Sequence, residues 1–176
     1  MTIREAEFTA LRQTIAARGT ARVVLAAAIV VAWSLLALLQ GLYSDLPLLA
    51  LIPLTVLVAG FEAVWVLHVG VERIGRFLQL TYESPDGASW ETTAMRASPG
   101  LPGSGADPLF TVVFALAALV NLGVAFVAEP TPLEIVLLFA AHAGLLLRLA
   151  RARVVASRQR RADLEAFRAV HRPTEP

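Results

Sequence analysis

Charged side chains within long apolar stretches are the residues of this sequence best placed to carry chemistry. Glu62 comes 17 residues after Asp45, and Arg148 comes 16 residues after Pro132. At 1.5 Å per helical residue, each would lie about 25 Å from the start of its stretch. A charge inside a bilayer needs a partner, so the sequence predicts an ion pair between Glu62 and Arg148. The pair could fix helix packing or couple ions or protons, or each side chain could instead reach the inner headgroups.

Asn121 and His142 form a second pair of intramembrane polar candidates. Counted along their helices, their depths in a 30 Å core differ by only about 5 Å. The two apolar stretches that carry them are joined by a short loop, so a hydrogen bond between the helices is expected. Such a bond mainly fixes helix register. The spacing of Ala140 and Gly144 favours close packing beside it, and a metal or proton site is the alternative.

His68, Glu72 and Glu83 could contribute ligands to a metal. His68 and Glu72 are four residues apart on one helical face, and Glu83 follows eleven residues later, nearly in phase. A metal needs three or four ligands, however, and the other two histidines are far away in the sequence. Arg76, four residues after Glu72, is a simpler partner for that carboxylate.

The sequence contains none of the short motifs that mark common catalytic sites. It has no Walker loop, G-x-G-x-x-G turn, G-x-S-x-G elbow or H-E-x-x-H pair. It also has no cysteine, which excludes disulfides, thiolate metal sites and cysteine nucleophiles. We therefore expect no catalytic residue and no cofactor.

Four apolar stretches must position the polar candidates. They cover residues 23–42, 46–70, 109–128 and 133–150. A helix that spans a membrane needs about 20 mainly apolar residues. With 57% hydrophobic residues overall, the chain lacks the polar helix faces that a soluble bundle needs. The sequence predicts an all-α fold, an integral membrane bundle of four antiparallel helices.

The basic residues indicate the orientation of this bundle. All 15 are arginines, and they lie before the first stretch, between the second and third, and at or after the end of the fourth. The two short loops that remain contain none. Cytoplasmic loops retain basic residues, so both termini are expected in the cytoplasm. Arginine in place of lysine, with abundant Ala, Leu and Val, suggests a GC-rich bacterial genome and the bacterial cytoplasmic membrane. The expected partner of these arginines is the anionic inner leaflet of the bilayer, not nucleic acid.

The N-terminal residues 1–22 are predicted to form a cytoplasmic amphipathic helix. Thr2 and Glu5 have the spacing of a capping box. The helix could lie at the interface or extend the first span. Gly19-Thr20 is the expected break between the two helices.

Three further segments are assigned to the cytoplasm. The second helix is expected to run on to about residue 83, followed by a loop over 84–108 and, after the fourth span, an arginine-rich tail over 151–176. Asp107 is the expected N-cap of the third span, with Pro108 at the first helical position.

These cytoplasmic segments carry the features that membrane insertion does not explain. The leading hypothesis is therefore a non-enzymatic scaffold or complex subunit that acts through its cytoplasmic helices on itself or on a membrane-protein partner. Its expected interaction surface comprises Arg73, Arg76, Phe77 and Trp90. The first alternative is a homo-oligomeric transporter or channel that uses Glu62 or His142. The second is a membrane enzyme for lipid-phase substrates, with His68, Glu72 and Glu83 at the inner interface.

Overall fold

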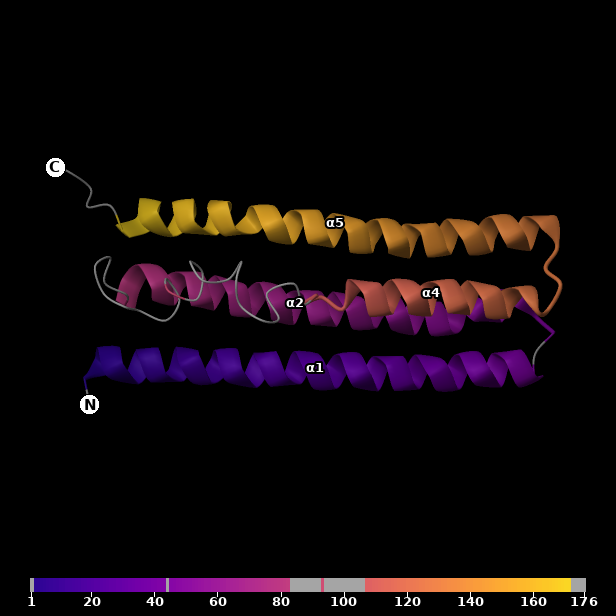
Figure 1. Ribbon diagram of the computed structural model, residues 1–176, viewed down its shortest axis with the longest axis horizontal. Helices are drawn as coiled ribbons and strands as arrows, with labels where there is room; N and C mark the ends of the chain where they lie inside the picture. The colour runs from indigo at the N-terminus through magenta and orange to yellow at the C-terminus, as the bar shows by residue number, and fades with distance from the viewer. Residues whose placement is uncertain (1, 44, 83–92, 94–106, 172–176) are drawn as a thin grey trace. The chain divides into compact units, whose positions relative to one another are not determined.

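The computed structural model describes residues 2–43, 45–82, 93 and 107–171. Of this part of the chain, 92% is helical and none is strand. The elements in order are α1 (Ile3–Tyr43), a short 3-10 helix η1 (Pro47–Ala50), α2 (Leu51–Tyr82), α4 (Thr111–Phe126) and α5 (Pro132–His171) (Figure 1). The predicted all-α fold is confirmed.

Among the described residues, three helices are long and apolar enough to cross a membrane. They are α1, the continuous run from Pro47 to Tyr82, and the first part of α5, Pro132–Ala156. The fourth apolar helix, α4, has 16 residues and a length of about 24 Å. It is shorter than the stretch 109–128 that the sequence predicted as a span.

The chain divides into two compact units, each with its own packing. The apolar unit comprises Arg22–Val66 and Asp107–Val154. The arginine-rich unit comprises the described residues of Met1–Ala21, Leu67–Ala106 and Val155–Pro176. Helices α1, α2 and α5 contribute residues to both units, whereas α4 belongs to the apolar unit alone.

Each helix of the apolar unit buries one stripe of residues at the spacing of three and four that a helix face requires. On α1 the stripe is Ala26, Ile29, Trp33, Ala37 and Gln40, and on α4 it is Thr111, Phe114, Ala117, Ala118, Asn121 and Ala125. The fully buried rings of Phe61 and Phe114 meet edge to face, with centroids 5.5 Å apart. The remaining faces of these helices are apolar and exposed, as a lipid environment would allow.

Helices α1 and α2 approach closely within the apolar unit because Gly60 has no side chain. A Cβ atom at Gly60 would lie 2.5 Å from Ile29 Cδ1 and 2.6 Å from Ile29 Cγ2. Small residues at helix interfaces permit this kind of contact between membrane helices.

The arginine-rich unit is held together by a row of aromatic rings from three helix segments. Phe8 of α1 lies 5.5 Å from Tyr82 of α2, measured between ring centroids. Phe77 lies 6.3 Å from Tyr82 and 5.7 Å from Phe167 of α5. Phe77, assigned to an interaction surface from the sequence, is therefore part of the internal packing of this unit.

Helix α1 begins as predicted but has no break. Glu5 accepts the Thr2 N–H at 2.8 Å, and Thr2 Oγ1 accepts the Glu5 N–H at 3.3 Å, which completes the capping box. The helix then continues through Gly19-Thr20 to Tyr43, so the expected break is wrong. A single helical glycine costs only about 1 kcal/mol, which the strong helix formers around it offset.

The start of α4 also differs from the prediction. The helix begins at Thr111, and Phe110 before it has a left-handed backbone with φ of 52°. Asp107 does cap the helix, but across a preceding turn: its carboxylate accepts the Val112 N–H at 3.0 Å. Pro108 therefore lies in that turn and not at the first helical position.

Candidate functional site

A buried polar cluster in the apolar unit centres on Asn121, which is completely buried. Its Nδ2 donates to the backbone oxygen of Ala50 at 2.9 Å and lies 3.1 Å from His142 Nε2. Its Oδ1 accepts the indole N–H of Trp33 at 3.2 Å. The cluster thereby joins α1, η1, α4 and α5 through one side chain, and both amide hydrogens and the oxygen of Asn121 have partners.

The hydrogen bonds define the protonation state of His142. Its Nδ1 lies 2.7 Å from the backbone oxygen of Leu138, and a carbonyl only accepts, so Nδ1 carries a hydrogen. Its Nε2 faces the donor amide of Asn121 and must therefore be the bare nitrogen. A second proton on this ring would point at an N–H₂ group, so the geometry suits a neutral packing histidine and not a proton carrier.

Glu62 and Arg148 meet in a two-point ion pair within the apolar unit. Arg148 Nε lies 2.7 Å from Glu62 Oε1, and Arg148 Nη2 donates to Glu62 Oε2 at 2.8 Å. The guanidinium also lies 5.5 Å from the Phe61 ring centroid and 5.3 Å from that of Trp65, within cation–π range. The fork of Arg148 thus matches the carboxylate of Glu62 while aromatic faces cover its plane.

The location of this ion pair limits what it can do. The Glu62 and Arg148 side chains are 43% and 32% exposed on the surface of the apolar unit. Neither residue lines the groove that contains Trp33 and Val124 or the groove that contains Thr111 and Arg153. The pair joins α2 to α5 at a helix surface.

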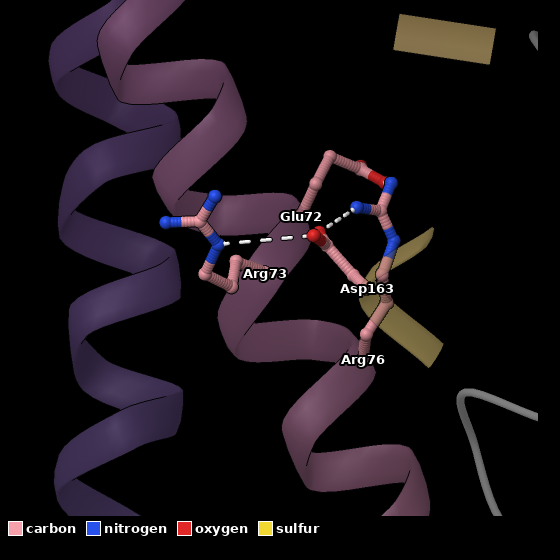
Figure 2. A network of polar contacts seen from close by, with 4 residues as sticks. All are labelled: Glu72, Arg73, Arg76 and Asp163. Atoms are coloured by element: carbon pink, nitrogen blue, oxygen red, sulfur yellow. Dashed lines mark hydrogen bonds and ion pairs between the residues drawn. The ribbon is translucent and has the colours of Figure 1, made fainter. Parts of the chain in front are cut away.

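A second charged cluster connects α2 with α5 in the arginine-rich unit. Figure 2 shows the carboxylate of Asp163 between the guanidinium groups of Arg73 and Arg76. Arg76 is only 7% exposed, donates to Asp163, and binds Glu72 at 3.1 Å. Arg73 lies 4.0 Å from the other oxygen of Asp163. Arg76 therefore has a structural role inside this unit, whereas Arg73 remains half exposed.

The structure places no third metal ligand beside His68 and Glu72 among the described residues. His68 and Glu72 line the same small cavity of about 10 Å³, together with Arg76. The Glu72 carboxylate is bound to Arg76. Among the described residues, no group of three His, Cys, Asp or Glu side chains could hold a metal ion. Glu83 lies outside the described residues, as does Trp90 of the expected interaction surface.

A third polar group caps α4 and reaches α5. The Asp107 carboxylate accepts hydrogen bonds from Thr111 Oγ1 and from the N–H groups of Leu109 and Val112. Burial raises the pKa of Asp107, but these hydrogen bonds, with the nearby Arg153 charge, outweigh burial and hold that pKa below its usual value. Arg153 donates to Thr111 Oγ1 at 3.3 Å.

Trp33 and Asp163 belong to these polar clusters, and sequence reasoning did not predict either of them. Trp33 lies in an apolar stretch, where a tryptophan is commonly a membrane-interface anchor, and only its N–H gives it a polar role. Asp163 lies on the same tail stripe as Ala152, Ala156 and Phe167. An acidic residue on an otherwise apolar stripe was the available signal.

Comparisons of the chain with protein-family models, with curated proteins and with solved structures gave no match.

Proposed function

We propose that this chain is a multi-pass protein of the bacterial cytoplasmic membrane that acts as a scaffold or complex subunit. The apolar unit is an antiparallel four-helix bundle that spans the bilayer. The arginine-rich unit lies at the cytoplasmic side, with both termini, and binds a second copy of the chain or another membrane protein. The protein has no enzymatic activity of its own.

The contacts between α4 and α5 support the antiparallel arrangement. Thr111 meets Arg153, Asn121 meets His142, and the rings of Phe126 and Phe139 lie 6.0 Å apart. Residue numbers rise along one helix as they fall along the other. The distribution of arginines supports the orientation, because translocated loops lack basic residues.

The observation that carries the proposal is the packing of the arginine-rich unit. Its buried Arg76 is held by Asp163 and Glu72, and its aromatic row joins α1, α2 and α5. A tail that served only to mark topology would need no such internal order. The exposed faces of these helices are rich in charge, as in helix surfaces that recognise other proteins.

The geometry does not favour the transporter alternative. Both carboxylate oxygens of Glu62 contact Arg148, and both ring nitrogens of His142 have hydrogen-bond partners. A coupling residue has to exchange its proton or ion with a path. These two side chains instead join helices.

The proposal is tested by photo-crosslinking in intact cells. A photoreactive phenylalanine analogue replaces Arg161 or Glu165, both exposed on α5 in the arginine-rich unit. The matched control replaces Asp45 in the turn before η1. We expect one adduct of constant mass from positions 161 and 165 and none from position 45. An adduct of twice the chain mass identifies a second copy.

Ion flux in proteoliposomes supplies the opposing result. The purified chain should leave the vesicles proton-tight, and Glu62→Gln should change nothing. A proton or cation flux that Glu62→Gln abolishes, with no adduct from positions 161 and 165, would overturn the scaffold proposal in favour of a transporter.

A further inference from the structure

A surface groove between α4 and α5 combines an apolar floor with a cationic end. Its volume is about 240 Å³, and its apolar lining comes from Val112, Ala115, Leu146, Leu149 and Ala150. Thr111 and Arg153 complete the lining at one end. All of these residues belong to the apolar unit.

Arg153 has donor groups to spare. A guanidinium carries five N–H donors. Within the described part of the chain, the hydrogen bond to Thr111 Oγ1 is the one direct polar contact of this group. The Asp107 carboxylate nearby is already occupied by the Thr111 hydroxyl and by two backbone N–H groups. The side chain of Arg153 is exposed, so an anion can reach it.

The depth of Arg153 matches that of inner-leaflet phosphates. From Pro132 at the start of α5, the 21 residues to Arg153 rise about 32 Å. The hydrocarbon core of a bilayer is about 30 Å thick. Arg153 would therefore lie where acyl chains end and headgroups begin. Arg148, one and a half turns earlier, lies within the core and is already paired with Glu62.

We propose that this groove binds one anionic phospholipid of the inner leaflet. An acyl chain lies along the apolar floor between α4 and α5, and the phosphate accepts hydrogen bonds from Arg153. Charge complementarity selects this occupant over a neutral lipid or a partner helix. The groove between α1 and α4, lined by Trp33, Gly41 and Val124 among others, has no charged residue in its lining within the described chain. The inference rests on the membrane location in the proposed function.

The test is a lipid titration of the full chain in mild detergent, followed by native mass spectrometry. Phosphatidylglycerol and phosphatidylcholine with identical acyl chains are compared. We expect one phosphatidylglycerol to bind preferentially, and Arg153→Gln to lower its affinity about fivefold, the effect of one arginine near a lipid surface. Arg151→Gln, an exposed arginine outside the groove on the same helix, is the matched control and should leave the affinity unchanged.

The acyl part of the site is tested separately. Ala150 is exposed and lines the groove, so Ala150→Phe fills it without disturbing the buried stripe. This variant should weaken both lipids while its melting temperature stays that of the wild type. Inorganic phosphate, as a headgroup without a chain, should not compete with the lipid.

Three results would overturn the lipid site. The first is an equal loss of phosphatidylglycerol affinity in Arg153→Gln and Arg151→Gln, which would indicate nonspecific electrostatic attraction. The second is equal binding of both lipids to the wild type. The third is competition by inorganic phosphate. Alkaline carbonate extraction of the same membranes separates the two proposals. A chain that stays in the membrane yet shows no lipid preference refutes only this inference, whereas an extracted chain refutes the proposed function as well.

Discussion

Asn121 is the residue on which four elements of the apolar unit depend. Its amide donates to Ala50 and His142 and accepts from Trp33. One side chain thus provides hydrogen-bond partners to three buried polar groups, which the hydrocarbon of a bilayer could not do. Hydrogen bonds between membrane helices are worth about 0.6 kcal/mol each on average. Loss of the shared partner costs more, because the remaining groups stay buried and unpaired.

Asn121→Leu is therefore expected to lower the free energy of unfolding by about 2 kcal/mol. Leucine has the same branched side-chain skeleton as asparagine, so the loss mainly reports the hydrogen bonds to Trp33, His142 and Ala50, with a smaller contribution from packing the two larger methyl groups. Unfolding by a denaturing detergent, followed by tryptophan fluorescence, measures it. Ser34→Ala is the control, since the one hydrogen bond of the Ser34 hydroxyl within the described part of the chain is to the Val30 oxygen of its own helix. Equal effects of the two substitutions would refute the central role of Asn121.

In the arginine-rich unit, Asp163 has a role like that of Asn121, because it is the shared partner of Arg73 and Arg76. Asp163→Asn leaves the nearly buried Arg76 with Glu72 as its one carboxylate partner among the described residues, and we expect a local loss of about 2 kcal/mol. Hydrogen exchange by mass spectrometry should show faster exchange over residues 67–82 and 158–171. Glu165→Gln, an exposed acid on the same helix, should leave exchange unchanged. Unaltered exchange in Asp163→Asn would contradict the role assigned to the cluster.

Polar pairs were predictable from the sequence where depth alone brings them together. Glu62 with Arg148 and Asn121 with His142 follow from counting residues along helices. Trp33 and Asp163 do not, because depth gives no information on which faces of α1 and α5 turn inward. That rotation is fixed by packing of complete helices, which a single sequence does not reveal.

At the scale of elements, the contact between α1 and α2 depends on Gly60. Gly60→Ala would place a methyl group within 2.8 Å of three Ile29 side-chain carbons. Overpacking of this kind costs about 1–3 kcal/mol. Gly144→Ala on α5 meets no atom within 4 Å and should be neutral or stabilising by up to about 1 kcal/mol. Thermal unfolding in detergent compares the two variants.

A second substitution tests the cause of that loss. Ile29→Ala removes the carbons that the new methyl group meets, so Gly60→Ala combined with Ile29→Ala should be less destabilised than the two single effects added together. Strict additivity would show that Gly60 matters for some reason other than this contact.

Helix existence was easier to predict than helix ends. Long apolar runs predicted the four α-helices α1, α2, α4 and α5 but not the separate 3-10 helix η1, and Gly19 was assigned a break that α1 does not have. One weak helix residue cannot stop a helix whose flanks are strongly helical. The left-handed Phe110 that delays α4 was equally hidden, because phenylalanine rarely adopts positive φ and gives no local signal.

For the whole molecule, the orientation in the membrane can be measured by labelling. The chain has no cysteine, so single substitutions report one site each. Asp45→Cys should react with an impermeant maleimide added to the outside of spheroplasts, and Glu165→Cys only after the membrane is opened. The reverse pattern would refute the proposed topology.

The Asn121 cluster also has a consequence for biogenesis. In a bilayer, α4 would enter with only 16 helical residues and a bare amide at its centre, both of which disfavour insertion. The groups that complete the amide, the Trp33 indole and the Ala50 carbonyl, come from segments synthesised earlier. The first helical pair would thus act as a template for the third helix, and α5, which follows α4 in the sequence, would complete the cluster through His142.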